Sequence, residues 1–165
     1  MNELLAQFYR HNRWANLRLL DLCAGLSEAQ WEASAPGTYG AVRDTFVHLL
    51  AAEQRYVSLL AGETAPQLVS ERDPFPGLDH LCAGAEWSGG ALIRIAAEME
   101  PDRILRGEYR GERYEMPVAV PLIQAINHAT EHRAHIVGIL SQHGVEPPEI
   151  DGWAFEPVLK ARTNG

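Results

Sequence analysis

Four long segments of helical periodicity constrain the fold of this chain more than any other feature. They span residues 2–24, 41–61, 78–99 and roughly 118–143, with glycine or proline near most of their ends. Apolar residues recur in them every three or four positions, which is the pattern of a helix with one buried face. The third segment is the weakest, because Ser88-Gly89-Gly90 interrupts it. The pattern predicts an all-α fold, an antiparallel four-helix bundle. In the first segment, the expected inward face is Leu4, Phe8, Ala15, Leu19 and Leu22.

The segments between these helices carry their own signals. Ser27 to Gln30 has the form of a capping box and predicts a short helix. Residues 63–77 contain three prolines and predict a long ordered loop that carries the chain from one end of the bundle to the other. Residues 105–116 alternate and turn at Gly111, which is consistent with a small hairpin. The aromatic residues of the tail at 150–155 are expected to pack back onto the bundle. We therefore expect residues 1–165 to form one domain.

Composition excludes several classes of function. Hydrophobic residues make up 46% and charged residues 22%, as in soluble globular proteins. The net charge of -8 and the lack of a basic stripe argue against nucleic-acid binding. No apolar run approaches the roughly 20 residues of a membrane span, and the first residues lack a signal-peptide layout. Cys23 and Cys82 are too few for a disulfide framework and are expected to be small core residues. These features predict a cytoplasmic protein.

Three histidines in the last long segment suggest a metal site. His128 and His132 lie only ~40° apart around a helix axis, and His135 lies within ~20° of His128. Their flanks are apolar, so the rings would face a dry interior that leaves ring nitrogens without partners. Neutral imidazole is a common ligand for zinc, copper, nickel and iron. A metal ion would therefore satisfy these nitrogens together.

His48 is the candidate third ligand. It falls on the inner stripe of the second segment, where a lone histidine is more often a hydrogen-bonded core group. Opposite His128 and His132, however, it could complete a site of three histidines with open coordination positions, as in catalytic centres. His135 is either a fourth ligand or a residue at the mouth of the site. We favour the mouth, because ~10 Å of helix rise separates it from His128.

Other polar residues have weaker claims on the site. Glu53 and Glu131 could orient the ligand imidazoles, although solvated helix charges are the more ordinary interpretation. His11 in the first segment could line the pocket. His80 and His143 lie near helix ends, where exposure is expected.

Several motifs together resemble the DinB/YfiT-like superfamily of metal-dependent enzymes. The resemblance covers nearly the whole chain and rests on the stretches 9–16, 44–53, 127–133 and 147–155. It implies an up-down-down-up bundle, with the long loop between the second and third helices as the crossover. It also implies a divalent metal, zinc or nickel, on His48, His128 and His132. The chain departs from the pattern at His135, where members often carry glutamine. Members are often dimers, so the resemblance implies a homodimer.

The resemblance also suggests a reaction. Characterised members include metal-dependent enzymes that transfer low-molecular-weight thiols, such as mycothiol or bacillithiol, to electrophiles or isomerise thiol adducts. The leading hypothesis is therefore a metal-dependent thiol S-transferase of detoxification or stress response, acting on a small-molecule substrate. A metal-dependent hydrolase is an alternative, because such an ion can also generate hydroxide. A non-catalytic metal-binding stress protein is a third possibility.

Overall fold

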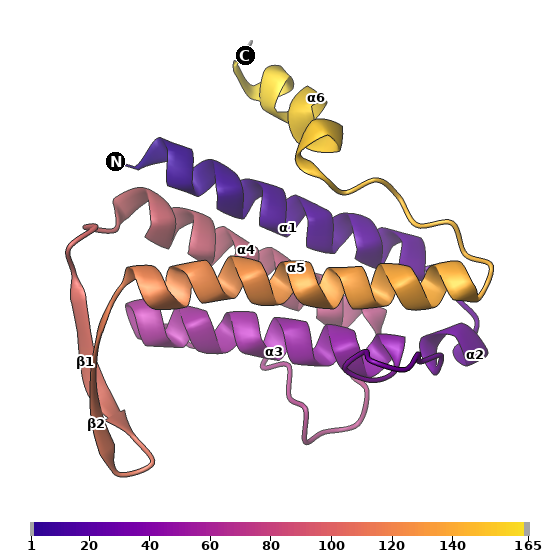
Figure 1. Cartoon of the computed structure of the whole chain (residues 1–165), viewed down its shortest axis with the longest axis horizontal. Coiled ribbons are helices and arrows are strands. Elements are labelled where there is room, and N and C mark those ends of the chain that lie inside the picture. Colours follow the sequence, from indigo (N-terminus) through magenta and orange to yellow (C-terminus); the bar gives the residue numbers. More distant parts are fainter. Residues whose placement is uncertain (1, 164–165) are drawn as a thin grey trace.

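Residues 2–163 are described in the computed structural model, and they form six helices and one two-stranded sheet (Figure 1). The elements in chain order are α1 (Glu3–Cys23), α2 (Glu28–Trp31), α3 (Val42–Ala61), α4 (Leu78–Glu98), β1 (Ile104–Tyr109), β2 (Glu112–Pro117), α5 (Ala119–Gln142) and α6 (Gly152–Thr163). The four long helices begin and end close to the positions that periodicity predicts. The fold is therefore mostly helical, but the hairpin corrects the expected all-α class.

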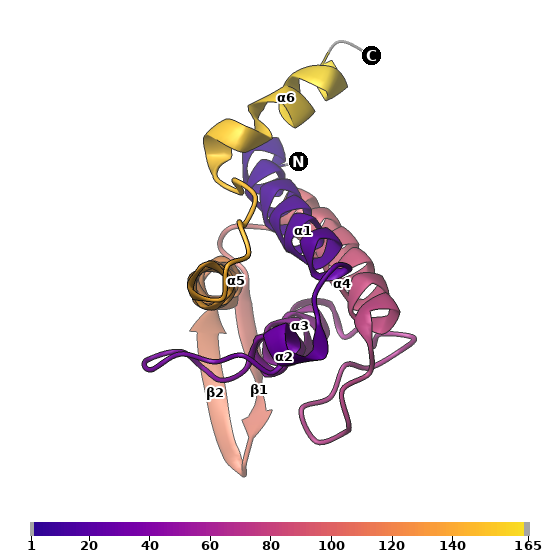
Figure 2. The same ribbon diagram turned by 90° about the vertical axis from the view of Figure 1, so that its right-hand side faces the viewer.

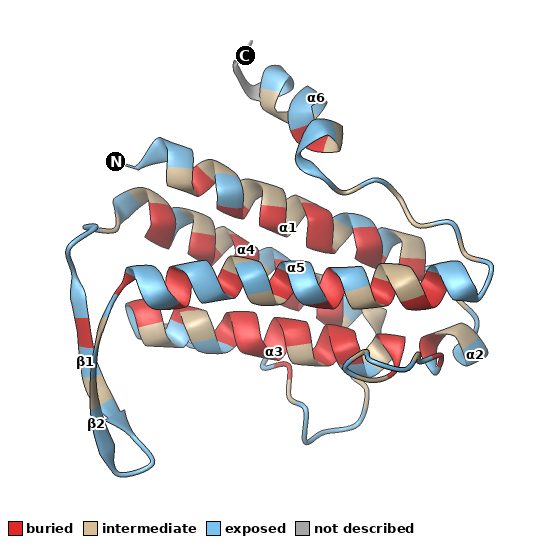
Figure 3. Ribbon diagram, viewed as in Figure 1, coloured by how far each residue is buried: buried red, intermediate tan, exposed pale blue. Residues whose placement is uncertain are grey.

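The four long helices enclose the core between them. α1 packs against α4 and α5, and α3 packs against the same two helices (Figure 2). Buried residues line the inner faces, whereas exposed residues cover the outside (Figure 3). The expected inward face of α1 is correct for Ala15 and Leu19, which are fully buried. It is wrong for Leu4 and Phe8, which are 73% and 56% exposed. Tyr9 takes the inward position instead.

The helix α4 continues without a break through Ser88-Gly89-Gly90, although this triplet weakens the sequence signal. Packing between helices explains the presence of Ser88 and Gly89. A Cβ atom at Gly89 would lie 2.6 Å from Cγ of Arg13, so only glycine lets α1 approach this closely. Ser88 is fully buried, and its hydroxyl donates to Glu53 at 2.7 Å. The residues that lower intrinsic helix propensity are thus the ones that the contact between helices requires.

The structure confirms the sequence signals for helix ends and for the hairpin turn. Ser27 and Gln30 form the capping box of α2. Gly62 ends α3 in the left-handed conformation, as glycine commonly does at this position. The hairpin pairs Ile104 with Pro117 and turns at Arg110-Gly111, where both residues have positive φ. Two such residues are typical of the tight turns whose twist matches that of the strands.

The loop between α3 and α4 is held to α3 by side chains. Gln54 accepts a hydrogen bond from the backbone N–H of Val69 at 2.9 Å and donates to the carbonyl of Gln67 at 3.2 Å. Gln54 is buried and Val69 contributes to the core. The loop is therefore ordered, as its sequence predicts, and it brings Glu71 beside α3.

The tail only partly follows the expectation. It forms the helix α6, which the sequence analysis did not predict. Phe155 is buried and packs against Trp14, whereas Trp153 is 85% exposed. Within the described part of the chain, no helix has the length and apolar character needed to cross a membrane.

Candidate metal centre

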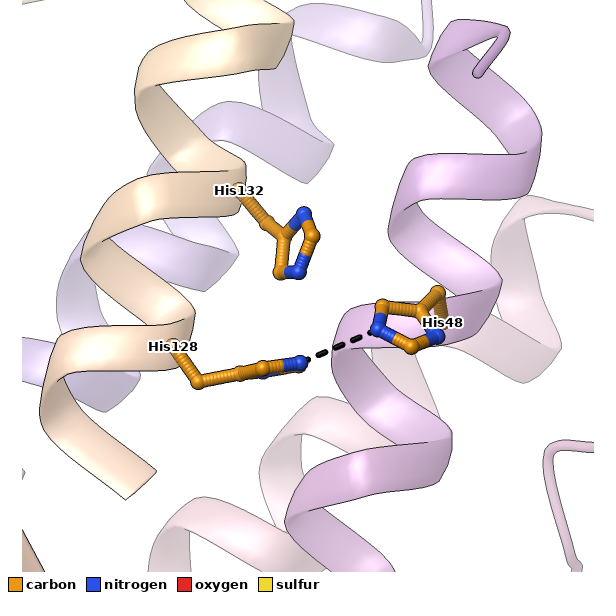
Figure 4. Close-up of side chains that lie close together, drawn as sticks. All are labelled: His48, His128 and His132. Carbon is orange, nitrogen blue, oxygen red and sulfur yellow. Dashed lines mark hydrogen bonds between the residues drawn. The ribbon is translucent and has the colours of Figure 1, made fainter. Parts of the chain in front are cut away.

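His48, His128 and His132 come together between α3 and α5 (Figure 4). His48 lies on α3, while the other two are one turn apart on α5. One ligand atom from each ring lies within 4.8 Å of the others. The Nε2 atoms of His48 and His128 are 3.0 Å apart. Two imidazole nitrogens at this distance either share one proton or point at a common ligand.

The burial of these rings makes their missing partners significant. His132 is only 5% exposed, and His48 and His128 are half-buried. The Nδ1 atoms of His128 and His132 are buried and have no hydrogen-bond partner. No described residue forms a hydrogen bond with His132 at all, although buried polar groups are normally paired. An ion held on the side of His128 that faces His48 would bind its Nε2 and would not pair its Nδ1, so the cost of burying that Nδ1 is separate from metal binding.

The spacing suits a transition-metal ion. Zinc holds histidine nitrogens at about 2.0–2.1 Å in tetrahedral geometry, which places two ligand nitrogens about 3.3 Å apart. The 3.0 Å between His48 and His128 is close to this value. The three ligand atoms lie within 4.8 Å of one another, so the three histidines could hold a metal ion if the more distant rings moved closer together. Three protein ligands leave a coordination position for a water or substrate.

A carboxylate that the sequence analysis missed orients His48. Glu71 Oε2 lies 2.9 Å from His48 Nδ1, so the ring donates from Nδ1 and presents Nε2 to the other histidines. Arg55 donates to the other oxygen of Glu71 at 2.9 Å. The Tyr39 hydroxyl donates to Glu71 at 2.9 Å, and its ring stacks on His48 with centroids 4.0 Å apart. Carboxylates that hold histidine ligands in this way fix the ring and its tautomer.

Electrostatics favours neutral imidazoles and an ionised carboxylate. Burial, followed by the nearby His132, His48 and Arg55, lowers the pKa of His128 to about 4. Burial and neighbouring histidines also lower the pKa of His132. For Glu71, burial raises the pKa, but hydrogen bonds from His48, Arg55 and Tyr39 outweigh it and lower the pKa to about 2. Histidine must be neutral to bind a metal, so the cluster is ready for a ligand at neutral pH.

The remaining candidates lie elsewhere or are only adjacent. His135 is outside the group of three, and its ring centroid is 5.5 Å from that of His132. His11 does not line the site. Its Nε2 lies 2.8 Å from the carbonyl oxygen of Ile150, in hydrogen-bond contact, and its ring packs against Phe155. His143 is exposed, as expected. His80 is half-buried, with Nε2 3.2 Å from the carbonyl oxygen of Leu68.

Both interpretations of Glu53 are wrong. This residue is fully buried, so it is not a solvated charge, and among the described residues it has no hydrogen bond with a histidine. Its carboxylate accepts from Asn12 at 2.7 Å, from Asn16 at 2.9 Å and from Ser88. Arg133 donates to the side-chain oxygens of both asparagines. Glu53 is therefore part of a second polar cluster, which we call the buried network: Asn12, Asn16, Glu53, Ser88 and Arg133. Glu131 is exposed, as its ordinary interpretation predicts.

Two surface grooves flank Glu71. One has a volume of about 600 Å³ and is lined by Tyr39, Arg43, Phe75 and neighbouring residues. The other, of about 670 Å³, is lined by residues of α3 and the following loop, including Arg55 and Arg72. Both volumes are in the range of small-molecule sites. Glu71 lines both grooves and contacts His48, whereas none of the three histidines lines either groove.

The fold and the three histidines define a class: a mostly helical protein with a group of side chains that can hold a metal ion. The model of the DinB family matches residues 1–161, and this chain belongs to that family. A crystal structure of a DinB-like protein from Bacillus cereus ATCC 10987 has the same fold, with a TM-score of 0.67 and 18% sequence identity. The alignment covers 90% of this chain and 99% of that one. No curated protein sequence matches this chain.

Proposed function

We propose that this protein is a metal-dependent enzyme whose ion, zinc or nickel, is held by His48, His128 and His132. One observation carries the proposal: three imidazoles from two helices converge, with one ligand atom of each within 4.8 Å of the others. Structural zinc sites in proteins are usually closed by four protein ligands, whereas three leave room for substrate. The open position therefore favours catalysis over a purely structural ion.

The proposed reaction is thiol transfer to a small electrophile. A bound zinc or nickel ion would supply a Lewis acid that favours the thiolate over the thiol. The thiol proton would pass to solvent, the sulfur would form a bond to the electrophilic carbon, and the leaving group would depart with its electron pair. The three histidines would hold the ion in place, and Glu71 and Tyr39 would fix the orientation of the His48 ring. This choice of reaction is supported by the family resemblance and by the two grooves beside Glu71.

The proposal includes the setting of the site. We propose one domain in which α1, α3, α4 and α5 form an antiparallel up-down-down-up bundle. This arrangement is supported by the packing of α1 and α3 against both α4 and α5, and by the long loop that joins α3 to α4. A cytoplasmic homodimer that acts on a small molecule, without nucleic acid or membrane, is the form in which we expect the enzyme to work.

Metal content tests the proposal directly. Protein loaded with Zn²⁺ or Ni²⁺ and then desalted should retain about one ion per chain, measured by elemental analysis. His48→Ala, His128→Ala and His132→Ala should each remove most of this metal, because each deletes one of three ligands. The exposed His143→Ala is the matched control and should keep it.

Activity then separates the reaction classes. The zinc-loaded protein should form a thioether from a low-molecular-weight thiol and a model electrophile, and chelation should abolish this activity. Turnover of an ester or phosphate substrate without thiol would favour a hydrolase instead. Metal retained in all three histidine variants would contradict the proposed site altogether.

A further inference from the structure

The buried network forms a continuous chain of hydrogen bonds between α5 and α3. Arg133 Nη1 donates to the side-chain oxygens of Asn12 and Asn16, at 2.7 and 2.8 Å. The amide nitrogens of the same two asparagines donate to a single oxygen of Glu53. Two parallel amide bridges thus join one guanidinium nitrogen to one carboxylate oxygen. Because each asparagine donates at one end and accepts at the other, the two amides have only one orientation that satisfies the network.

The network connects the two helices that carry the candidate ligands. Arg133 directly follows His132 on α5, and Glu53 lies on α3 together with His48. The bridging asparagines are one turn apart on α1, and Ser88 adds a contact from α4. All four long helices therefore contribute to one cluster in the interior. Arg133 also donates to Thr130 at 3.1 Å, which holds its side chain against α5.

Such a network can specify helix position in a way that apolar packing does not. Apolar contacts are non-directional, whereas hydrogen bonds weaken steeply with misalignment. A shift of α5 by one residue would rotate its side chains by about 100°. This shift would break both amide bridges and leave Arg133 and Glu53 buried without partners, which is costly. The same rotation would turn His128 and His132 away from His48.

We infer that Asn12, Asn16, Glu53 and Arg133 are positioning residues that fix the rotation of α5 on α3 so that His128 and His132 meet His48. None of the four touches the histidine cluster through a hydrogen bond, so they act through the helices. The inference rests on the proposed metal function. The competing explanation is that the network only stabilises the fold.

Metal affinity measured beside thermal stability separates the two explanations. The double variant Glu53→Gln/Arg133→Met removes both buried charges together and avoids the cost of leaving one unpaired. Asn16→Ala is a milder variant that removes one bridge and leaves the other. Leu92→Ala is the matched control, because it opens a cavity on α4 in a fully buried position outside the network. Zn²⁺ affinity is measured by competition with a chromophoric chelator, and the Tm is measured on metal-free protein.

A positioning role predicts that Zn²⁺ affinity does not simply follow thermal stability among these variants. The double variant should bind Zn²⁺ about tenfold more weakly than the unaltered protein, at the lower end of the effect of losing a group that directly holds a metal ligand, because these residues act through the helices. Asn16→Ala should weaken binding by a few fold, and this variant decides the question if the double variant does not fold. Leu92→Ala should lower the Tm and leave Zn²⁺ affinity unchanged at temperatures where it is folded.

Two results would overturn the inference. One is unchanged Zn²⁺ affinity in Asn16→Ala and, where the double variant folds, in that variant as well. The other is an equal loss of affinity in Leu92→Ala, which would mean that binding follows general stability. A failure of the proposed metal function gives a different result: Zn²⁺ binding to the unaltered protein would then not depend on His48.

Discussion

The two polar clusters inside this protein differ in how their hydrogen-bonding groups are satisfied. In the buried network, the carboxylate of Glu53 has three donors and the side-chain oxygens of Asn12 and Asn16 receive Arg133. In the histidine cluster, buried ring nitrogens have no partner. Both clusters include residues of α3 and α5. Burial alone therefore does not explain the difference.

This comparison shows which cluster is complete within the chain. A fully paired polar cluster needs nothing else and can serve the fold, whereas an unpaired one loses stability until a ligand binds. Burial raises the pKa of Glu53, against hydrogen bonds from Ser88, Asn12 and Asn16 that lower it, whereas burial lowers the pKa values of His128 and His132 and favours their neutral forms. The network is thus built around a carboxyl group whose hydrogen bonds the chain itself supplies, and the histidine cluster around imidazole lone pairs.

The largest expected effect comes from breaking the network at one end. Glu53→Leu would leave the amide nitrogens of Asn12 and Asn16 and the hydroxyl of Ser88 buried without their acceptor, and at about 1 kcal/mol or more for each unsatisfied group the loss is about 3 kcal/mol or more. We expect the free energy of unfolding of the metal-free protein to fall by this amount in urea titrations.

The matched variant in the other cluster should behave differently. His132→Ala removes a ring that has no hydrogen bond among the described residues, so it loses packing but leaves no new unpaired group. We expect a smaller loss than for Glu53→Leu in the same titration. Equal losses would mean that the histidine cluster is as complete in the metal-free protein as the network is, and the comparison would fail.

Much of this arrangement could be predicted from sequence, because it depends on periodicity. The helical period placed four long helices within a few residues of their ends, and it placed His48 and the pair His128 and His132 on facing stripes. The same logic misplaced Leu4 and Phe8, since it identifies an apolar face without knowing which neighbour covers it. α1 is covered along the stripe that contains Tyr9.

The parts that sequence reasoning missed depend on tertiary contact. Glu71 lies in a proline-rich loop without periodicity, and its place beside His48 depends on tertiary contacts such as those of Gln54 with that loop. Glu53 was recognised as a polar residue beside the site, but its partners come from α1 and α4. A buried glutamate and a surface glutamate look alike in one sequence until the facing asparagines are known.

A smaller effect is expected where the histidine cluster does have a protein partner. Glu71→Gln keeps an acceptor for His48 Nδ1 but removes the negative charge. Because carboxylates raise the basicity of histidine ligands, we expect Zn²⁺ affinity to fall about tenfold, or about 1.4 kcal/mol, in chelator competition. Glu63→Gln, which breaks an exposed ion pair with Arg94, is the control and should bind Zn²⁺ normally. Unchanged affinity in Glu71→Gln would show that this contact does not tune the site.

The smallest effect is the pH dependence that the histidine cluster contributes. Burial lowers the pKa of His128 from 6.5 to about 4 in the folded protein, so the unfolded chain binds more protons between these values. The free energy of unfolding of metal-free protein should therefore be fully retained above about pH 6.5 and should decline as the pH falls towards 4. Because His128 is only half-buried, solvent screening keeps this decline under about 1 kcal/mol.

Glu71 supplies the internal comparison for this measurement. Burial raises its pKa, but its hydrogen bonds prevail and lower the value to about 2, from 4.5. Its contribution should persist above about pH 4.5 and disappear only as the pH falls towards 2. In urea titrations across the full range, His128→Gln should flatten the profile between pH 6.5 and 4, and Glu71→Gln should flatten it below 4.5. Profiles of His128→Gln that superpose on those of the unaltered protein would mean that this imidazole is not held neutral, and that the histidine cluster does not differ from a solvated group in its response to protons.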